Sequence, residues 1–225
     1  MGDFSVQGSS LALPSFNPSG ANDGPAAVSR RGEQITIPYQ EAWSNKEHAY
    51  MISNVTRNTA LAMGGTSFSD TAPALLMDVA AGTTVKNFHL RLRQGGTVAG
   101  GVITVILTTD VIARYSSGGT AITVRNMKQG GGVAVGNRRA SGVTVYGTTP
   151  TAAAVNTAIT LYATILTQDV GAGTLVNSPN ASFDYPSWGE IVPELVGPAS
   201  IVLYTFAGTT QPSWFFHADW LEVDS

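Results

Sequence analysis

The side chains with most capacity for chemistry lie between residues 180 and 194, where carboxylates and aromatic rings are interleaved. A sugar could be bound there by the rings of Tyr185 and Trp188 and the carboxylate of Asp184. Two carboxyl groups about 5 to 9 Å apart could also hydrolyse a glycosidic bond. The prolines of the same stretch favour a third interpretation, an irregular loop whose aromatic side chains cap a sheet edge or contact a neighbouring protein.

No other group of residues has the spacing of an active site. The three histidines, His48, His89 and His217, lie far apart in the sequence without metal-ligand spacing, and cysteine is absent. The glycine triplet at 130–132 lacks the Lys-Ser/Thr pair of a phosphate loop, and no serine lies in a nucleophile elbow. We therefore expect no enzymatic activity, no cofactor and no bound metal.

The charge of the chain is low for its length. Charged residues make up 12% of the chain, about half of the roughly 25% of an average soluble domain. Such a deficit suits a surface covered in an assembly, because charged residues are depleted at the cores of interfaces. A threonine-rich β-protein that is simply uncharged explains the composition equally well.

Nucleic acid and membrane are both unexpected partners. The net charge is −3 and the basic residues occur as isolated pairs such as Arg91 and Arg93, without a basic run. No apolar stretch approaches the roughly 20 residues of a membrane span, and the first residues lack a signal-peptide pattern. We expect a soluble product made in the cytoplasm.

Short β-type runs separated by turns fill the chain from residue 34 onward. Phe88, Leu90 and Leu92 alternate with polar residues, which is the period of a strand with one buried face. Frequent glycine-rich turns leave little room for helices. The pattern predicts an all-β protein, either a barrel or an antiparallel β-sandwich, and of these the sandwich with jelly-roll topology is preferred.

The first 33 residues differ from the rest and predict an extended or flexible N-terminal arm before the β-sandwich domain of residues 34–225. The arm is rich in Ser, Gly, Pro and Asn, with lone apolar residues. Leu11, Leu13 and Phe16 could each fill a pocket on a neighbouring subunit, and we expect them to bind a partner. A disordered terminus is the alternative.

The last strand predicts self-association. Between Trp214 and Val223, apolar residues occur on both faces, so Phe215, Leu221 and Val223 must be covered after the other face has filled the core. An exposed apolar patch usually marks an interface. We expect a homo-oligomer, a trimer, with Phe215 and Leu221 at the subunit contact; coverage by the arm or a loop of the same chain is the alternative.

Five segments carry a resemblance to a known class of protein. They are Glu47-His48-Ala49-Tyr50-Met51-Ile52-Ser53-Asn54, Thr59-Ala60-Leu61-Ala62, Ala72-Pro73-Ala74-Leu75-Leu76, Arg114-Tyr115-Ser116-Ser117-Gly118-Gly119-Thr120-Ala121 and the closing Trp214 to Val223. In this order they resemble virion structural proteins of tailed bacteriophages. The resemblance implies a component of the virus particle, with a jelly-roll fold and trimeric assembly, and it transfers no catalytic residue.

Two functions follow as hypotheses. The first is a capsid decoration, or cement, protein that stabilises the shell by binding neighbouring capsomers, so its partners are the major capsid protein and itself. The second is a tail-associated receptor-binding module that recognises a host-surface glycan through Asp184, Tyr185 and Trp188. A main capsid protein is less favoured, because the chain has no basic arm to neutralise packaged genome.

Overall fold

The structure, a computed structural model, describes residues 48–54, 56, 58–96, 98, 101–128, 140–155, 157–167, 181–187 and 191–224. The chain divides into two units, Met1–Ala42 and Trp43–Ser225, and every described residue belongs to the second. Leu11, Leu13, Phe16 and Trp188 lie outside the described residues, so the predicted functions of these four residues stay predictions.

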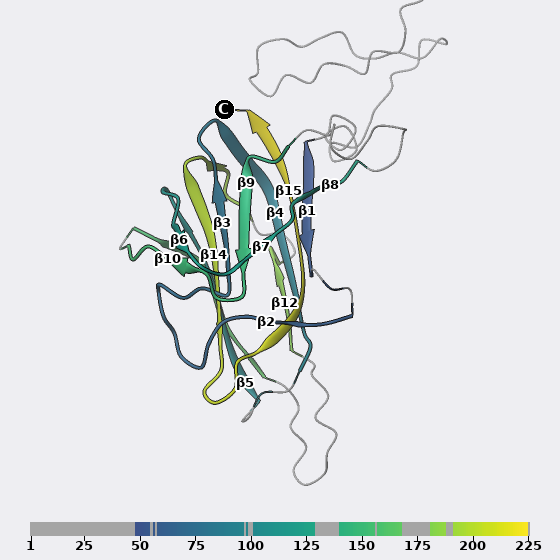
Figure 1. The fold of residues 1–225 in the computed structure, drawn as a ribbon, viewed down its shortest axis with the longest axis vertical. Helices are drawn as coiled ribbons and strands as arrows, with labels where there is room; N and C mark the ends of the chain where they lie inside the picture. The colour runs from purple at the N-terminus through teal and green to yellow at the C-terminus, as the bar shows by residue number, and fades with distance from the viewer. Residues whose placement is uncertain are drawn as a thin grey trace, which may run out of the picture. The chain divides into compact units, whose positions relative to one another are not determined.

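Two large antiparallel sheets form most of the described part of the second unit (Figure 1). The first sheet has the order β12 (Ser182–Tyr185), β4 (Thr83–Gln94), β15 (Ser213–Asp224), β1 (Ala49–Ser53) and β8 (Arg125–Asn126), with β13 (Leu195–Val196) beside β4 and β2 (Leu61–Ala62) beside β15. The second sheet has the order β11 (Ile159–Thr167), β5 (Val102–Asp110), β14 (Ala199–Phe206), β3 (Leu75–Val79), β9 (Val143–Gly147) and β7 (Thr120–Ile122). A separate two-stranded sheet joins β10 (Thr151–Ala152) to β6 (Tyr115–Ser117).

The path of the chain between the sheets is that of a jelly roll. Four strands of the first sheet, β12-β4-β15-β1, face four of the second, β11-β5-β14-β3. The chain alternates between the sheets along β1, β3, β4 and β5, continues from β5 to β11 within the second sheet, and alternates again along β12, β14 and β15. First and last strands are thereby neighbours, as the two Greek keys of a jelly roll require. The predicted all-β antiparallel sandwich is confirmed, and the described residues contain no helix.

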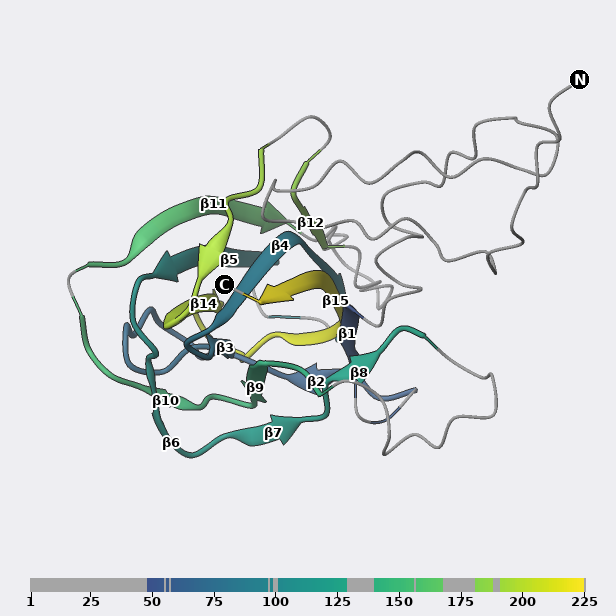
Figure 2. The same cartoon turned by 90° about the horizontal axis from the view of Figure 1, so that it is seen from above.

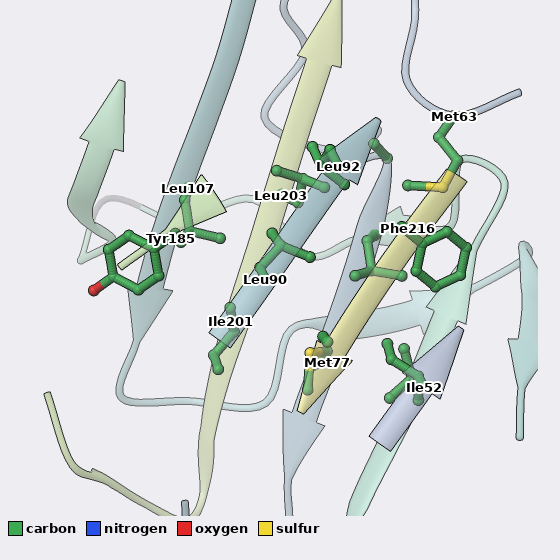
Figure 3. Close-up of a cluster of buried hydrophobic side chains, with 14 of the residues drawn as sticks. Ile52, Met63, Met77, Leu90, Leu92, Leu107, Tyr185, Ile201, Leu203 and Phe216 are labelled. Atoms are coloured by element: carbon green, nitrogen blue, oxygen red, sulfur yellow. The ribbon is translucent and has the colours of Figure 1, made fainter. Parts of the chain in front are cut away.

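The core lies between the two sheets. Phe88, Leu90 and Leu92 on β4 are at most 2% exposed, as their alternation predicts, and the intervening His89, Arg91 and Arg93 face outward. Figure 3 shows Leu90, Leu92, Phe216 and Ile52 of the first sheet close to Met77, Leu107, Ile201 and Leu203 of the second. Such burial is the main source of stability in a chain without disulfides.

Polar groups fasten β15 across the core at both ends. Near its start, the indole Nε1 of Trp214 donates to Oγ1 of Thr205 on the second sheet at 3.2 Å. Near its end, the fully buried carboxylate of Glu222 accepts from the Trp220 indole at 2.8 Å, the Gly142 amide at 2.8 Å and the hydroxyl of Ser141. Ser141 and Gly142 immediately precede β9, so Glu222 connects the last strand of the first sheet to the second.

Candidate assembly surfaces

The outer face of the first sheet is a grid of polar and charged side chains. Cross-strand pairing places Asp184 of β12 beside Arg91 of β4, Arg91 beside His217 of β15, and His217 beside Ser53 of β1. The adjacent row pairs His89 with Asp219. Every member comes from the outward positions of strands whose other face fills the core, so strand periodicity creates this surface.

Ion pairs neutralise much of this grid. The Arg93 guanidinium donates to both carboxylate oxygens of Asp184, at 3.1 and 3.0 Å, and Nε of Arg91 lies 4.0 Å from the same carboxylate. All three side chains are about half exposed or more. Exposed pairs of this kind contribute about 0–1 kcal/mol. These ion pairs keep the outer face of the first sheet polar, but they add little to the free energy of unfolding.

Two histidines share one carboxylate in the grid. Nδ1 of His89 lies 3.3 Å from Oδ1 of Asp219, and Nε2 of His217 lies 3.2 Å from Oδ2. Sequence spacing gave no sign of this cluster, since β4 and β15 are distant in the chain. The part of the chain that the structure describes contains no group of three such residues able to hold a metal ion.

The predicted glycan site is not assembled as expected. Asp184 faces outward, but the ring of Tyr185 is 5% exposed and packs in the core, with its centroid 6.4 Å from that of Phe88. Consecutive residues of a strand face opposite sides of the sheet, so these two cannot serve one ligand. The prediction that Tyr185 stacks on a sugar is wrong. The sequence contained the signal, because Phe183 and Tyr185 alternate with polar residues.

The predicted interface on β15 is reduced to one residue. Phe215 is 37% exposed, but Leu221 and Val223 are 6% and 5% exposed and form a small buried cluster with Ala49 of β1. The premise that Leu221 remains uncovered in one chain is therefore wrong, and the alternative of coverage by the same chain applies to it. Phe215 at a subunit contact stays a prediction.

A buried charge network covers one end of the second sheet. Arg114 is fully buried and donates to the Tyr204 hydroxyl at 3.0 Å and to Oδ2 of Asp70 at 2.9 Å. The Tyr204 hydroxyl in turn donates to Oδ1 of Asp70 at 3.0 Å. Burial, together with the Asp70 carboxylate and despite the Arg114 cation, raises the pKa of Tyr204 to about 12. Tyr204 lies on the outer side of β14, so the network holds the loops at Asp70 and Arg114 against this face.

A second fastening lies beside this network. The carboxylate of Asp78 on β3 accepts from the amides of Arg114 and Tyr115, both at 2.9 Å. The Tyr115 ring then stacks on Tyr146 of β9, with centroids 3.6 Å apart and planes 5° from parallel. Together these contacts hold the segment at Arg114 and Tyr115 against the outer side of β3 and β9.

At the other end of the second sheet, on its outer side, the side chains of β5, β11 and the end of β14 are partly exposed and carry no charge. Cross-strand rows place Phe206 beside Thr104 and Thr104 beside Ile165, and the next row places Ile106 beside Ala163. Ile165 is 66% exposed and Val102 47%. We call this surface the uncharged face and define it as Val102, Thr104, Ile106, Ala163, Ile165 and Phe206. The exposed Phe68 ring borders it, with its centroid 6.1 Å from that of Phe206.

The uncharged face ends at an open strand. Among the described residues, β11 pairs with β5 alone, and Figure 2 shows it at the end of its sheet with β5 on its inner side. Its sequence, Ile-Thr-Leu-Tyr-Ala-Thr-Ile-Leu-Thr, contains no charged residue, proline or glycine. The loose alternation of apolar residues from Ile159 to Leu166 predicts a central strand, as does the denser apolar run at 102–107. The prediction of a strand is confirmed, but among the described residues β11 lies at an edge of its sheet.

Comparisons with known proteins identify no relative: no family model, curated protein or solved structure matches the chain. Within the described segments, no helix is long and apolar enough to cross a membrane.

Proposed function

We propose that this protein is a structural component of a virus particle, a capsid decoration protein that binds neighbouring capsomers and copies of itself. Its action is the burial of surface, and no bond is made or broken. The major capsid protein is the proposed partner on the shell.

The observation that carries the proposal is the uncharged face. Isolated apolar residues are normal on a protein surface, but a contiguous apolar patch marks an interaction site. Here Val102 and Ile165 are about half exposed or more on one end of one sheet, and the Phe68 ring at the border of this face is also about half exposed. The low overall charge of the chain fits the same explanation, because this face contributes none.

Two further considerations support the setting in a virus. Jelly rolls occur in viral capsid proteins, although lectin domains and cupins share the architecture, so this support is analogy of fold. The sequence resemblance to phage virion proteins includes Arg114 and Tyr115, whose side chains here bond to Asp70 and Tyr204 and stack on Tyr146, respectively, and so hold a loop on the second sheet. A role in holding that loop explains why such a turn would recur in proteins that share the fold.

Electron cryomicroscopy of particles purified from cells that express the chain tests the proposal. We expect copies of the jelly roll on the outer shell, with the uncharged face against a neighbouring protein. Copies only at the tail, or particles without the chain, would overturn it. A glycan array is the companion test, since binding of a defined sugar would favour the receptor-binding alternative.

A further inference from the structure

The edges of the two sheets differ in how they are protected against pairing with another chain. Natural edge strands are kept short or carry charged residues, because their free N–H and C=O groups are templates for a further strand. In the described part of the first sheet, the edge strand β12 has four residues and includes Asp184, and the edge strand β8 has two and includes Arg125. In the second sheet, β7 has three residues.

The β11 edge lacks each of these protections. It has nine residues, without charge, proline or glycine. None of the nine is buried, and its residues are more exposed than those of any other long strand. At about 3.4 Å per residue it spans roughly 30 Å, with one bulge between Thr160 and Tyr162, and among the described residues its outer edge has no partner strand. An edge of this length and composition is a template for a further strand.

The absence of charge on β11 indicates which partner strand it can pair with. Two copies of one strand carry the same net charge, so Lys and Arg alone, or Asp and Glu alone, on β11 would repel the same residues of its copy near a two-fold axis. β11 and the adjoining outward positions of β5, from Val102 to Thr108, contain none. The edge is therefore electrostatically compatible with itself, and the charged β12 edge is not.

We propose that β11 pairs antiparallel with β11 of a second copy of this chain, so that two six-stranded sheets become one continuous sheet across a two-fold axis. This inference goes beyond the proposed function, because it requires no virus particle. A nine-residue strand contributes fewer residues than the roughly 20–30 a side of a standard interface. The dimer is therefore weak and its population rises with protein concentration.

Ala163 and Ala121 provide a matched pair of variants. Both are exposed alanines on edge strands of the same sheet, Ala163 on β11 and Ala121 on β7. Sedimentation velocity of the full chain, from micromolar to near-millimolar concentration, should show wild-type protein and Ala121→Lys shifting from monomer to dimer. Ala163→Lys should remain a monomer throughout, with an unchanged melting temperature that excludes misfolding as the cause.

A thiol scan tests the contact directly, because the chain has no cysteine of its own. Ala163→Cys and Ile165→Cys place single thiols on the outward side of β11, and Ala121→Cys is the control. Under mild oxidation at high concentration, at least one of the β11 variants should form a disulfide-linked dimer at least about tenfold faster than the control.

The opposite outcomes are equally clear. Wild-type protein that is monomeric at every concentration, or equal cross-linking at β11 and β7, would overturn the proposal. So would an oligomer that Phe215→Ser dissociates and Ala163→Lys does not. A β11 dimer that is absent from virus particles would leave this inference standing and overturn the proposed function.

Discussion

The two outer faces of the jelly roll differ in where their charged side chains lie. On the first sheet, charged side chains stand in solvent and pair with one another, as Arg93 does with Asp184. On the second sheet, Arg114 is buried beneath loops, where it forms an ion pair with Asp70. The rest of that outer face carries no exposed charge among the described residues. The difference shows that a low charge content need not be spread evenly over a surface: here the exposed charges of the described sheets lie on one outer face and part of the other outer face carries none.

The largest expected effect is a loss of stability when one arginine from each face is replaced and the two losses are compared. Arg114→Met removes a fully buried guanidinium that donates to the Asp70 carboxylate, the Tyr204 hydroxyl and the Ala153 carbonyl, which should cost about 2–4 kcal/mol of unfolding free energy. Arg93→Met breaks an exposed pair and should cost at most about 1 kcal/mol. Urea denaturation of both variants measures the difference. Equal losses would show that the two networks do not differ as their burial indicates.

The Tyr204 hydroxyl should make the stability of the Arg114 network depend on pH. Its folded pKa is about 12, against 10.0 as the ordinary value. Because the folded pKa is raised, the contribution is fully present below pH 10 and is lost as pH rises towards 12, where the unfolded chain ionises first. The stability of wild-type protein should fall more steeply between pH 10 and 12 than that of Tyr204→Phe. Parallel curves would show that the network does not hold the phenol neutral.

The apolar exposure of the two faces can be compared without reference to any partner. Ile165→Ser should reduce retention on a hydrophobic-interaction column more than Phe215→Ser, because Ile165 is 66% exposed within an uncharged surface and Phe215 is 37% exposed beside Arg93. Since both side chains lie on the surface, Ile165→Ser should change stability by no more than about 0.5 kcal/mol. A larger retention change for Phe215→Ser would instead favour the face of the first sheet as the assembly surface.

Strand periodicity predicted much of this fold and little of its surface. The alternation at Phe88, Leu90 and Leu92 sufficed to place β4 with one side in the core, and the sandwich followed from many such runs. Which strand lies at an edge depends on pairing between distant segments, so β11 was expected at the centre of a sheet. The same limit explains the error at Leu221, since strand alternation gives the face on which a residue lies but not what covers that face.

Arg114 illustrates a different limit. It lies in a turn-like segment, where an arginine is ordinarily solvated, and nothing local indicates that Asp70 and Tyr204 will enclose it. Its burial depends on two loops meeting over β14, a long-range contact that no sequence period encodes. The same holds for the two histidines that meet at Asp219.

The smallest expected effect is at Ser200, whose buried hydroxyl differs from that of Thr205 on the same strand in its hydrogen bonding. Oγ of Ser200 is buried without a hydrogen-bond partner among the described residues, whereas Oγ1 of Thr205 donates to the Met63 carbonyl at 2.8 Å and accepts from the Trp214 indole. Thr205→Val removes a satisfied group and leaves both partners unpaired, so we expect a loss of about 1–3 kcal/mol. Ser200→Ala removes an unsatisfied hydroxyl, so its effect on stability should be near zero or slightly favourable. A clear loss for Ser200→Ala in urea denaturation would show that the hydroxyl has a partner, such as an ordered water, beneath the loops that cover this end of the second sheet.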